Sequence, residues 1–451
     1  MSKSKVLKSV IKVIPEKCVN CHRCIANCPV KFCNDGSGDA VTIDDDLCIG
    51  CGSCLDACKH GARLAIDDSK EFLDWVDNKN PRKKPFIAIV APAIAANFEN
   101  SYLKINSFLQ SLGVEACFDV SFGAELTIKS YIEYIKKEKP KCVISQPCPA
   151  LVSFIEIYRP ELIPYLAPVH SPMLHTILMI NKYYPEYVNH RIVAISPCLA
   201  KRREFDDYSP DTLNVTFYSI EKYLEEKHIP LSSFPDTNYK NLSAERGVLF
   251  SMPGGLMRTA EREFPGITPK TRKIEGLHSV YPYLRDLPEY LKENKQKFPL
   301  IDCLSCEQGC NAGPGTCNSQ TFRDTLDSRN ETRSEEHIAK NSPKKIKQVV
   351  NKYWEGGMYT RTYQNRSYLY TDYIKIPSKY EIEEIYKKME KRSEKDIMDC
   401  AACGYNTCEE MAIAIYNNHN RPENCHHFLA LKMVELSNKH KLEISDAIQT
   451  V

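Results

Sequence analysis

Short β-branched runs alternate with amphipathic segments along the middle of the chain, between residues 84 and 320. The apolar runs are FIAIVAP, VEACFDV, KCVIS, RIVAIS, GVLF and FPLID, and segments of helical periodicity such as SYLKINSFLQSLG and SIEKYLEEKH lie between them. Strands that alternate with helices are typical of an α/β domain with a mainly parallel sheet. We therefore expect an α/β fold in which helices flank mainly parallel sheets.

The C-terminal residues carry a different pattern. The segment FLALKMVELSNKHKLEISDAIQTV reads as a polar amphipathic helix. Its apolar residues Leu431, Val434, Leu442 and Ile448 fall roughly on one side. This helix either packs on its own domain or contacts a second copy or another protein, and the pattern favours neither.

Composition and charge narrow the class of protein. Apolar residues make up 43% of the chain and charged residues 26%, as in ordinary globular proteins. The net charge of +2 gives no reason to expect nucleic acid or an acidic membrane as a partner. The longest apolar window, PFIAIVAPAIAANF, is shorter than the ~18 residues that a membrane-spanning helix needs. The N-terminus lacks the apolar core of a signal peptide, so we expect a cytoplasmic location.

Cysteine is the unusual component, with 21 residues placed unevenly along the chain. Disulfide bonds are a poor explanation of so many cysteines in a protein without an export signal. Clustered thiols in such proteins usually bind metals or take part in redox chemistry. Three cysteine-rich regions therefore become the candidate sites.

Two runs near the N-terminus carry the most specific spacing. CVNCHRCIANCP and CIGCGSCLDACK both follow the C-x2-C-x2-C-x3-C pattern of two-cluster ferredoxins, in which the fourth cysteine of each run ligates the other cluster. A pair of zinc sites would use paired thiolates instead. The predicted ligands are Cys18, Cys21, Cys24 and Cys58 for one 4Fe–4S cluster, and Cys48, Cys51, Cys54 and Cys28 for the second. We interpret Cys33 as buried or incidental and His22 as a surface residue.

A second group lies near the C-terminus, in CAACGYNTCEEMAIAIYNNHNRPENC. Three clustered thiols and a fourth beyond a short helix can enclose a 4Fe–4S cluster, although a zinc ion held by four thiolates would show similar spacing. CAACGYNTC followed by AIAIY resembles a small iron–sulfur domain that is appended to several anaerobic redox proteins. The predicted ligands are Cys400, Cys403, Cys408 and Cys425.

The third group sits at the ends of predicted strands, in VISQPCP, VAISPC and LIDCLSCEQGC. Ligands of open α/β sheets bind beyond the carboxyl ends of the strands. Cys148, Cys198, Cys306 and Cys310 are therefore expected to converge on one point. The alternative is four separate thiols in the core, where free cysteine is common.

These motifs together resemble those of the iron-only (FeFe) hydrogenases, over most of the chain. The resemblance implies that Cys148, Cys198, Cys306 and Cys310 hold a 4Fe–4S cubane. Cys310 would also bridge to a two-iron subcluster that carries carbonyl, cyanide and a dithiolate. SPCLAKRRE matches the family's second motif, so Lys201 is expected to hydrogen-bond a cyanide. The matching segments APAI and MPGGLMR, with the positions of family methionines and glutamine, imply that Pro92, Ala93, Met173, Ser196, Pro253, Gly254 and Leu304 line the cofactor site.

The resemblance also implies a domain organisation. Residues 1–80 would form a two-cluster ferredoxin-like α+β domain, and residues 84–375 a two-lobed hydrogenase domain. Residues 376–451 would form a small helical 4Fe–4S domain that ends in the amphipathic helix.

The chain departs from the family where protons should move. Productive members have a second cysteine directly before the first cubane ligand, and this chain has Pro147 there. Proline has neither a titratable group nor a backbone N–H. Further along the path, Tyr131 and Tyr134 take the places of carboxylates, with Glu133 alongside, and Ala167 takes the place of a serine. Glu204 matches the terminal acid of the path.

We therefore expect a sensory-type hydrogenase that splits or forms hydrogen slowly and relays electrons through its 4Fe–4S clusters. A redox or signalling protein such as a kinase or phosphatase would be its partner, and a homodimer is compatible with the terminal helix. Two alternatives remain. One is a productive ferredoxin-linked enzyme whose protons take another route, through Cys303, Cys317 or His170. The other is an electron-transfer or cluster-delivery protein without the two-iron site, although retention of Lys201 and Cys310 argues against it.

Overall fold

The chain forms two compact units. The computed structural model describes residues 6–78, 84–295, 297–318 and 321–449, and it describes no side chains from 440 onward. The larger unit contains the residues up to Val10, Ile49–Gly52 and Ala65–Ser367. The smaller unit contains Ile11–Cys48, Ser53–Leu64 and the residues from Tyr368 onward. The predicted division into segments 1–80, 84–375 and 376–451 stays a prediction, but most of the first segment and nearly all of the third belong to one unit.

The larger unit contains a four-stranded parallel sheet in the order β6-β5-β8-β9. Its strands are β5 (Phe86–Val90), β6 (Val114–Asp119), β8 (Arg191–Ser196) and β9 (Leu213–Thr216). Strand β5 is buried at all of its positions, as parallel strands covered on both faces are. Ile87 of β5 pairs with Ile192 of β8, and Val193 of β8 pairs with Leu213 of β9.

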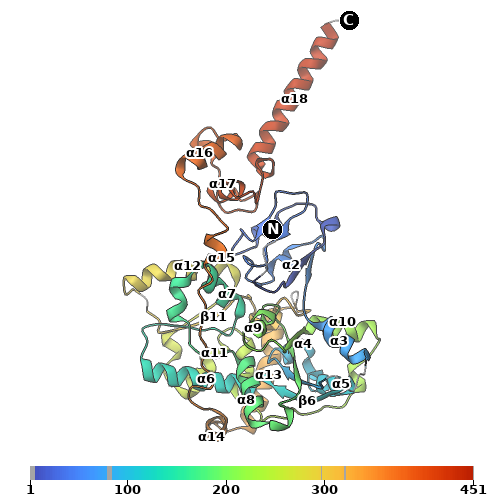
Figure 1. Ribbon diagram of the computed structural model, residues 1–451, viewed down its shortest axis with the longest axis vertical. Coiled ribbons are helices and arrows are strands. Elements are labelled where there is room, and N and C mark those ends of the chain that lie inside the picture. The colour runs from blue at the N-terminus through green and yellow to red at the C-terminus, as the bar shows by residue number, and fades with distance from the viewer. Residues whose placement is uncertain (1–5, 79–83, 296, 319–320, 450–451) are drawn as a thin grey trace. The chain divides into compact units, whose positions relative to one another are not determined.

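A second parallel sheet of the same unit has the order β10-β11-β7. Its strands are β7 (Val143–Ile144), β10 (Thr271–Glu275) and β11 (Leu300–Leu304). Two parallel sheets flanked by helices confirm the expected α/β class (Figure 1). The sequence pattern missed β10, because this edge strand exposes Arg272 and Lys273 and so lacks an apolar run.

The prediction of a strand at GVLF is wrong. These residues lie in the 3-10 helix η6 (Arg246–Ser251). The carboxylate of Glu125 accepts hydrogen bonds from the backbone N–H of Glu245 (2.9 Å) and of Gly247 (2.8 Å), which satisfies donors that a strand would have given to a neighbouring strand. Burial of Val248 and Leu249 then explains the apolar run without a sheet.

Helices surround both sheets of the larger unit (Figure 1). The most extensive helix pair is α6 (Val120–Glu138) with α8 (Pro172–Tyr183). The other helices are α3 (Ser69–Asn78), α4 (Ile94–Phe98), α5 (Lys104–Ser111), α7 (Pro149–Tyr158), α9 (Lys201–Tyr208), α10 (Phe217–Glu226), α11 (Gly255–Glu263), α12 (Leu277–Lys292), α13 (Arg323–Lys340) and α14 (Pro343–Tyr353). Helices α7 and α8 both begin with proline at the first helical position, where a missing N–H costs nothing.

The smaller unit is built from short elements. Its strands are β1 (Ile11–Val13) with β4 (Arg63–Ala65), and β2 (Asn34–Asp35) with β3 (Thr42–Ile43). Its helices are α1 (Arg23–Ala26), α2 (Ser53–Ala57), α15 (Tyr368–Thr371), α16 (Lys379–Lys388), α17 (Cys408–Tyr416) and α18 (His426–Gln449). None of the described helices combines the length and the apolar composition that crossing a bilayer requires.

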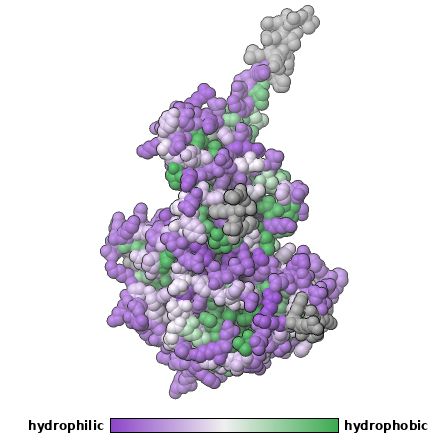
Figure 2. Space-filling model, in the orientation of Figure 1, coloured by the Kyte–Doolittle hydropathy of each residue, from purple (hydrophilic) through white to green (hydrophobic). Residues whose placement is uncertain are grey.

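The C-terminal helix α18 begins at His426, two residues before the expected segment. Leu431 is 44% exposed and Val434 is 59% exposed, and apolar residues are visible among hydrophilic ones at the base of this helix (Figure 2). Leu442 and Ile448, which the sequence placed on the same side, have side chains outside the described residues. In its described part, the predicted apolar side of the helix is not covered by its own domain.

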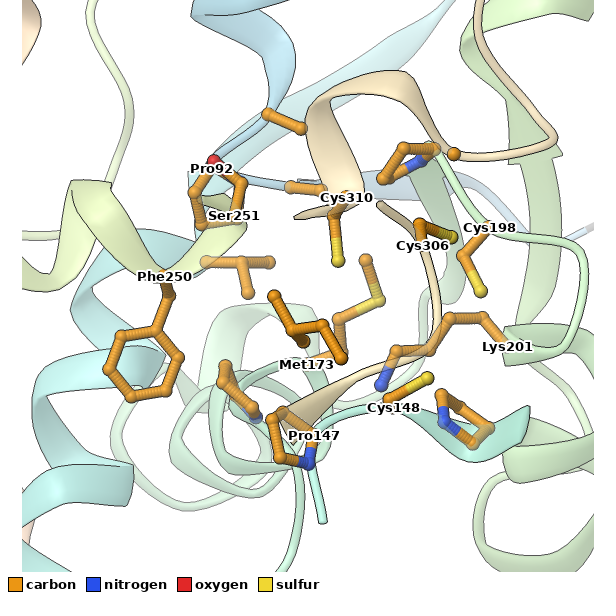
Figure 3. Close-up of a pocket in the computed structure, with 18 of the residues that line it drawn as sticks. Pro92, Pro147, Cys148, Met173, Cys198, Lys201, Phe250, Ser251, Cys306 and Cys310 are labelled. Atoms are coloured by element: carbon orange, nitrogen blue, oxygen red, sulfur yellow. The ribbon is translucent and has the colours of Figure 1, made fainter. Parts of the chain in front are cut away.

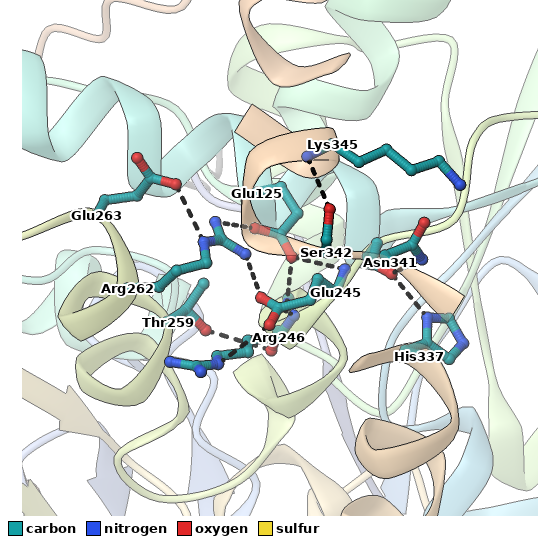
Figure 4. A network of polar contacts seen from close by, with 12 residues as sticks. Glu125, Glu245, Arg246, Thr259, Arg262, Glu263, His337, Asn341, Ser342 and Lys345 are labelled. Carbon is teal, nitrogen blue, oxygen red and sulfur yellow. Dashed lines mark hydrogen bonds and ion pairs between the residues drawn. The ribbon is translucent and has the colours of Figure 1, made fainter. Parts of the chain in front are cut away.

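A buried ionic network fixes η6 against its neighbouring helices (Figure 4). Arg262 of α11 donates to Glu125 of α6 at 2.6 Å and also to Glu245 just before η6. All three side chains are at most 4% exposed. The Arg262 guanidinium compensates the buried negative charge of Glu125. Glu125 in turn accepts the backbone hydrogen bonds that fix the start of η6.

Replacing Arg262 by alanine should lower the free energy of unfolding by ~3–5 kcal/mol, because it leaves the buried carboxylate of Glu125 without its cation, while Glu245 keeps only Arg246. The thermal unfolding midpoint of the chain measures the effect. Lys70→Ala is the control, since Lys70 pairs with Asp74 on the exposed surface and such pairs contribute little. Equal midpoints for the two variants would contradict this account of the network.

Candidate functional site

The cysteines at the predicted strand ends line a single cavity of about 80 Å³ in the larger unit (Figure 3). Cys148 follows strand β7, Cys198 follows β8, and Cys306 and Cys310 follow β11. Their sulfur atoms are turned toward the same space (Figure 3). The structure therefore brings together the four residues that the sequence expected to converge, from strands of both parallel sheets.

The loops reach the cavity because glycine permits close backbone approach. Gly309 has a φ of +63°, and a Cβ at this position would lie 2.4 Å from the carbonyl oxygen of Ser251. A Cβ on Gly313 would lie 2.6 Å from the carbonyl oxygen of Pro197. Only glycine fits at these two positions, which lie on either side of Cys310. The loop that carries Cys310 is thereby pressed against the loops before Cys198 and after η6.

Burial raises the pKa of all four thiols, to about 11 for Cys198. Each thiol also lies near at least one of the others, and neighbouring negative charge raises the pKa values of Cys198, Cys306 and Cys310 further. Thiols of this kind ionise when iron is bound, because a coordinated thiol loses its proton outright. Four soft donors in a dry, enclosed space fit an iron–sulfur group.

One cation serves this cavity. Lys201, at the start of α9, lines it with a side chain that is 8% exposed. Burial raises the pKa of Cys148, Cys198 and Cys310, and the Lys201 charge offsets part of that rise. The side chain runs close to Cys148 (Figure 3). Its ammonium donates to the carboxylate of Glu204, one turn further along the helix.

Glu204 is a positioning residue for that lysine. Its carboxylate also accepts hydrogen bonds from Arg361 (2.8 Å) and from the Ser171 hydroxyl (2.9 Å). Burial would raise the pKa of Glu204, but the Lys201 and Arg361 charges outweigh it and lower the pKa. The carboxyl is completely buried between these partners. It therefore does not reach the surface, as the terminal acid of a proton path would have to do.

Pro147 lines the cavity directly beside Cys148 (Figure 3). Behind it, the backbone N–H of Gln146 donates to the hydroxyl of Tyr131 (3.1 Å). Tyr131 and Ala167 are buried in one apolar cluster, and burial raises the pKa of Tyr131 well above its usual value. Tyr134 packs on the same cluster. The positions where the family pattern has carboxylates and a serine therefore belong to an apolar cluster.

Glu133 does not replace the expected carboxylates. It forms an ion pair with Lys129 (2.9 Å) one turn earlier in α6, and its side chain is 39% exposed. The Lys129 hydrogen bond lowers the pKa of Glu133. Shifting the alignment by one residue would thus supply a carboxylate at the surface rather than beside the cavity.

Only some of the predicted lining residues lie at the cavity. Pro92, Ala93, Met173 and Leu304 line the cavity, whereas Ser196, Pro253 and Gly254 do not. The Ser196 hydroxyl lies 2.7 Å from the side-chain oxygen of Asn214, on the neighbouring strand β9. The sequence missed Val120, Pro172, Phe250, Ser251 and Ser305, which also line the cavity. Phe250 and Ser251 belong to η6, and no motif pointed to them because that segment read as a strand.

None of the three residues considered as alternative proton relays lines the cavity. Cys303 is fully buried, and its thiol lies 3.6 Å from the carbonyl oxygen of Ser145. Cys317 is exposed. His170 stacks edge-on against Tyr208, and burial lowers its pKa to about 4.

In the smaller unit, several cysteine sulfurs of the ferredoxin-like runs already accept hydrogen bonds. Arg63 donates to Cys24 (3.2 Å), the backbone N–H of Val41 donates to Cys18 (3.4 Å), and the Cys33 sulfur lies 3.6 Å from that of Cys28. Cys33 therefore contacts Cys28, one of the predicted cluster ligands. The interpretation of His22 as a surface residue is wrong, since it is only 5% exposed.

The C-terminal cysteines Cys400, Cys403, Cys408 and Cys425 line a second, smaller cavity, together with Tyr405 and Met411. Across the described residues, no three His, Cys, Asp or Glu side chains lie as close together as ligands of one metal ion must. A 4Fe–4S cluster does not require such closeness, because each of its four thiolates binds a different iron. The donor set suits a cluster.

Family models match three parts of the chain. The model described as iron-only hydrogenase large subunit, C-terminal domain, matches residues 84–314, just over half of the chain. A 4Fe–4S binding domain matches residues 41–64. A model described as a putative Fe–S cluster matches residues 398–427.

Characterised relatives carry two kinds of name. Iron hydrogenase 1 of Clostridium pasteurianum is 25% identical over 66% of this chain and 63% of its own length. The periplasmic Fe hydrogenase large subunit of Nitratidesulfovibrio vulgaris is 23% identical over 61% of this chain and 86% of its own length. Protein NAR1 of Arabidopsis thaliana is 22% identical over 63% of this chain and 75% of its own length. The match thus spans less than two thirds of the clostridial protein.

Solved structures show the same fold. A FeFe-hydrogenase structure on stepwise H-cluster assembly superposes with a TM-score of 0.53 and 17% identity, covering 67% of this chain and all of that one. A structure on oxygen inactivation of FeFe-hydrogenase gives a TM-score of 0.52 and 18% identity over the same shares.

Replacing Cys148 by alanine should remove about four irons per chain after reconstitution with iron and sulfide, because a cubane that loses one of its ligands is not retained. Cys303→Ala is the matched control. Cys303 is a buried thiol two residues before Ser305, where the loop that carries Cys306 and Cys310 reaches the cavity, but Cys303 itself lines no part of that cavity. Iron and acid-labile sulfide assays measure both variants. Equal losses in the two proteins would contradict the assignment of Cys148.

Proposed function

The chain belongs to the iron-only hydrogenase large-subunit family, and on that premise we propose that it is a hydrogenase of low turnover. It would interconvert hydrogen with protons and electrons at a cluster held in the larger cavity. The observation that supports this is the composition of the cavity wall. Four cysteines and Lys201 surround one side, and Pro147 with an apolar cluster behind it closes another.

The residues that would hold the catalytic group are Cys148, Cys198, Cys306 and Cys310, with Cys310 shared between a 4Fe–4S cubane and a two-iron subcluster. When bound, the group supplies the metal chemistry of hydrogen cleavage and formation, with carbonyl, cyanide and a dithiolate as its other ligands. Lys201 supplies a fixed N–H donor, held by Glu204, toward an anionic ligand in the cavity. Apolar walls exclude water and strengthen that contact.

Proton removal is the weak step in this proposal. General acid–base assistance contributes ~10²–10⁴ to rate, and it needs a titratable group within reach of the reacting atoms. Pro147 offers no such group, and Tyr131 stays neutral because burial raises its pKa. Protons would then leave only by rare water entry or local opening, which slows turnover in both directions.

Slow turnover suits a protein that reports hydrogen better than one that consumes it in bulk. We propose a sensory role, with 4Fe–4S clusters that carry electrons to a redox or signalling protein, and with helix α18 as a contact for a partner or a second copy. A cytoplasmic location is part of the same proposal. The names of the relatives include both a periplasmic hydrogenase and cytosolic assembly factors, so they support no single location.

A second candidate is a role in iron–sulfur cluster assembly without hydrogen chemistry. Relatives named as the cytosolic Fe–S cluster assembly factor NAR1 of Yarrowia lipolytica and Protein NAR1 of Arabidopsis favour it. Lys201 at the cavity wall and Cys310 beside the other thiols favour the hydrogenase, because both would serve a two-iron site. A productive ferredoxin-linked enzyme would need a proton route that bypasses Pro147.

Maturation with the two-iron cofactor separates these candidates. The hydrogenase should show infrared bands of carbonyl and cyanide that shift under hydrogen, and about eighteen irons per chain against about sixteen for four cubanes alone. Lys201→Met is the control for the cavity, because it keeps the side-chain volume and removes the donor; its cyanide bands should shift. A fully loaded protein without these bands would support the assembly role instead.

Replacing Pro147 by cysteine should raise hydrogen turnover at least tenfold, because it adds a titratable thiol beside the reacting centre, within the ~10²–10⁴ range of acid–base assistance. Pro147→Ala separates this effect from the removal of the proline ring and should leave the rate low. Turnover of matured protein with an artificial electron acceptor measures both. Unchanged activity of the cysteine variant, or a wild-type rate as high as that of productive enzymes, would contradict the proposed limitation.

A further inference from the structure

Two predicted cluster loops of the smaller unit are in direct contact. His22 lies between Cys21 and Cys24 of the first cysteine run, and its Nδ1 donates to the carbonyl oxygen of Cys403 (3.0 Å) in the C-terminal group. Its Nε2 lies 3.0 Å from the side-chain oxygen of Asn20. The Nδ1 hydrogen bond fixes the ring against the C-terminal group. One hydrogen bond and one side chain separate Cys21 from Cys403, a predicted ligand of a different cluster.

Gly404 seals this contact. It has a φ of +93°, and a Cβ there would lie 3.0 Å from the carbonyl oxygen of His22 and 3.0 Å from the Cβ of Ile25. Helix α1 thus presses its first turn against the backbone that follows Cys403. No other residue permits this approach at that φ.

A buried lysine adds a second clamp. Lys31 is 6% exposed and donates to the carbonyl oxygen of Gly404 (2.8 Å) and to that of Ala26 (3.2 Å). The latter carbonyl belongs to the end of α1, so one ammonium joins the helix to the C-terminal loop. A buried ammonium placed on two carbonyl oxygens also puts positive charge beside both cysteine groups, where reduced clusters would carry negative charge.

Further contacts show that the two segments are built to fit each other. Tyr405 is fully buried and packs against Phe32, with ring centroids 6.0 Å apart. The backbone N–H of Gly36 donates to the carbonyl oxygen of His419 (2.8 Å), and Asn424 donates to the carbonyl oxygen of Gly36 (2.9 Å). The contact thus combines buried aromatic packing with hydrogen bonds from buried polar side chains.

We infer that the C-terminal cluster exchanges electrons directly with the ferredoxin-like cluster of Cys18, Cys21, Cys24 and Cys58, across the contact between His22 and Cys403. One electron leaves one cluster and enters the other, and no bond forms or breaks. His22 and Gly404 are positioning residues that keep the two cluster loops together. Electron tunnelling falls steeply with distance, so close and rigid packing is what this transfer requires.

The same observations give the C-terminal domain a place in the electron route. Cys400 is exposed, and the apolar side chains of Ile397 (37%) and Met398 (56%) are exposed just before it. An exposed ligand beside exposed apolar residues is suited to brief docking of a one-electron carrier protein. The C-terminal cluster thus serves as a port through which electrons enter or leave the ferredoxin-like domain.

This inference rests on the 4Fe–4S clusters and not on the two-iron site. The experiment therefore uses full-length chain loaded with iron and sulfide alone. Paramagnetic resonance of the reduced protein reports whether neighbouring clusters interact magnetically. We compare wild type with Cys400→Ala, which should lose the C-terminal cluster and about four irons. We expect the signal of the remaining clusters to narrow and its spin relaxation to slow when the C-terminal cluster is removed.

Gly404→Ala tests the contact itself. The added Cβ should separate the two loops and weaken the interaction several-fold without loss of iron. Gly357→Ala is the matched control, since Gly357 has a similar φ of +86° but no atom within 4 Å of its Cβ position. It should keep the wild-type spectrum.

Two results would overturn the inference. One is a wild-type spectrum that equals the sum of the Cys400→Ala spectrum and an isolated cluster signal. The other is a Gly404→Ala protein with full iron and an unchanged interaction. Should Gly404→Ala lose iron, the comparison of wild type with Cys400→Ala decides alone. Absence of carbonyl and cyanide bands after maturation would refute the proposed hydrogenase and leave this result untouched.

Discussion

Four thiols share one dry cavity, and much of the larger unit is arranged to keep them there. Burial and mutual proximity raise their pKa values, so the thiols gain nothing from one another before metal binds. Contacts outside the cavity must therefore hold the loops. Arg333 donates to the carbonyl oxygen of Pro92 (3.0 Å) and to Asp119 (2.8 Å), which caps helix α6. Arg262 holds η6 in the same way, through buried carboxylates rather than through the cysteines.

The cavity has two chemically different sides. Lys201 forms the charged side, fixed by Glu204, Arg361 and Ser171 in a closed set of hydrogen bonds. Pro147 lines the other side, with the apolar cluster around Tyr131 and Ala167 behind it. Proline has no titratable group, and burial raises the pKa of Tyr131 well above its usual value. The fixed ammonium of Lys201 can orient an anionic ligand, but it does not remove protons from the cavity. The hydrogenase proposed above would thus orient its anionic ligand on the first side and find no titratable group for proton removal at Pro147 on the second.

The sequence predicted the cysteine sites better than their surroundings. Ligand spacing is local, and the parallel strands β7 and β11 bring their carboxyl ends to one edge, so Cys148, Cys306 and Cys310 could be expected to meet. Cys198 joins them from β8 of the other sheet. The prediction of a strand at GVLF was wrong because its apolar pattern reflects burial between helices. The hydrogen bond that holds the start of this segment comes from the backbone N–H of Glu245 to Glu125, which is 120 residues away in sequence. Edge strand β10 has no apolar signal, and Ser196 turns toward Asn214 rather than the cavity. His22 could not be placed from sequence, since its partner Cys403 is 381 residues away.

The proposed slow proton removal at Pro147 bears on what the contact between His22 and Cys403 would do. Where proton removal limits turnover, an electron route faster than that step adds nothing to the steady rate. A rigid contact between clusters then governs something else, namely how quickly the oxidation state of the catalytic centre equilibrates with an outside carrier. Lys31 donates to the backbone of both cysteine-bearing segments, and in the inferred electron route its charge would offset the negative charge that an added electron brings. A sensory hydrogenase of the kind proposed, with slow proton removal and a closely packed C-terminal cluster, would be suited to holding a redox state that a partner protein can detect.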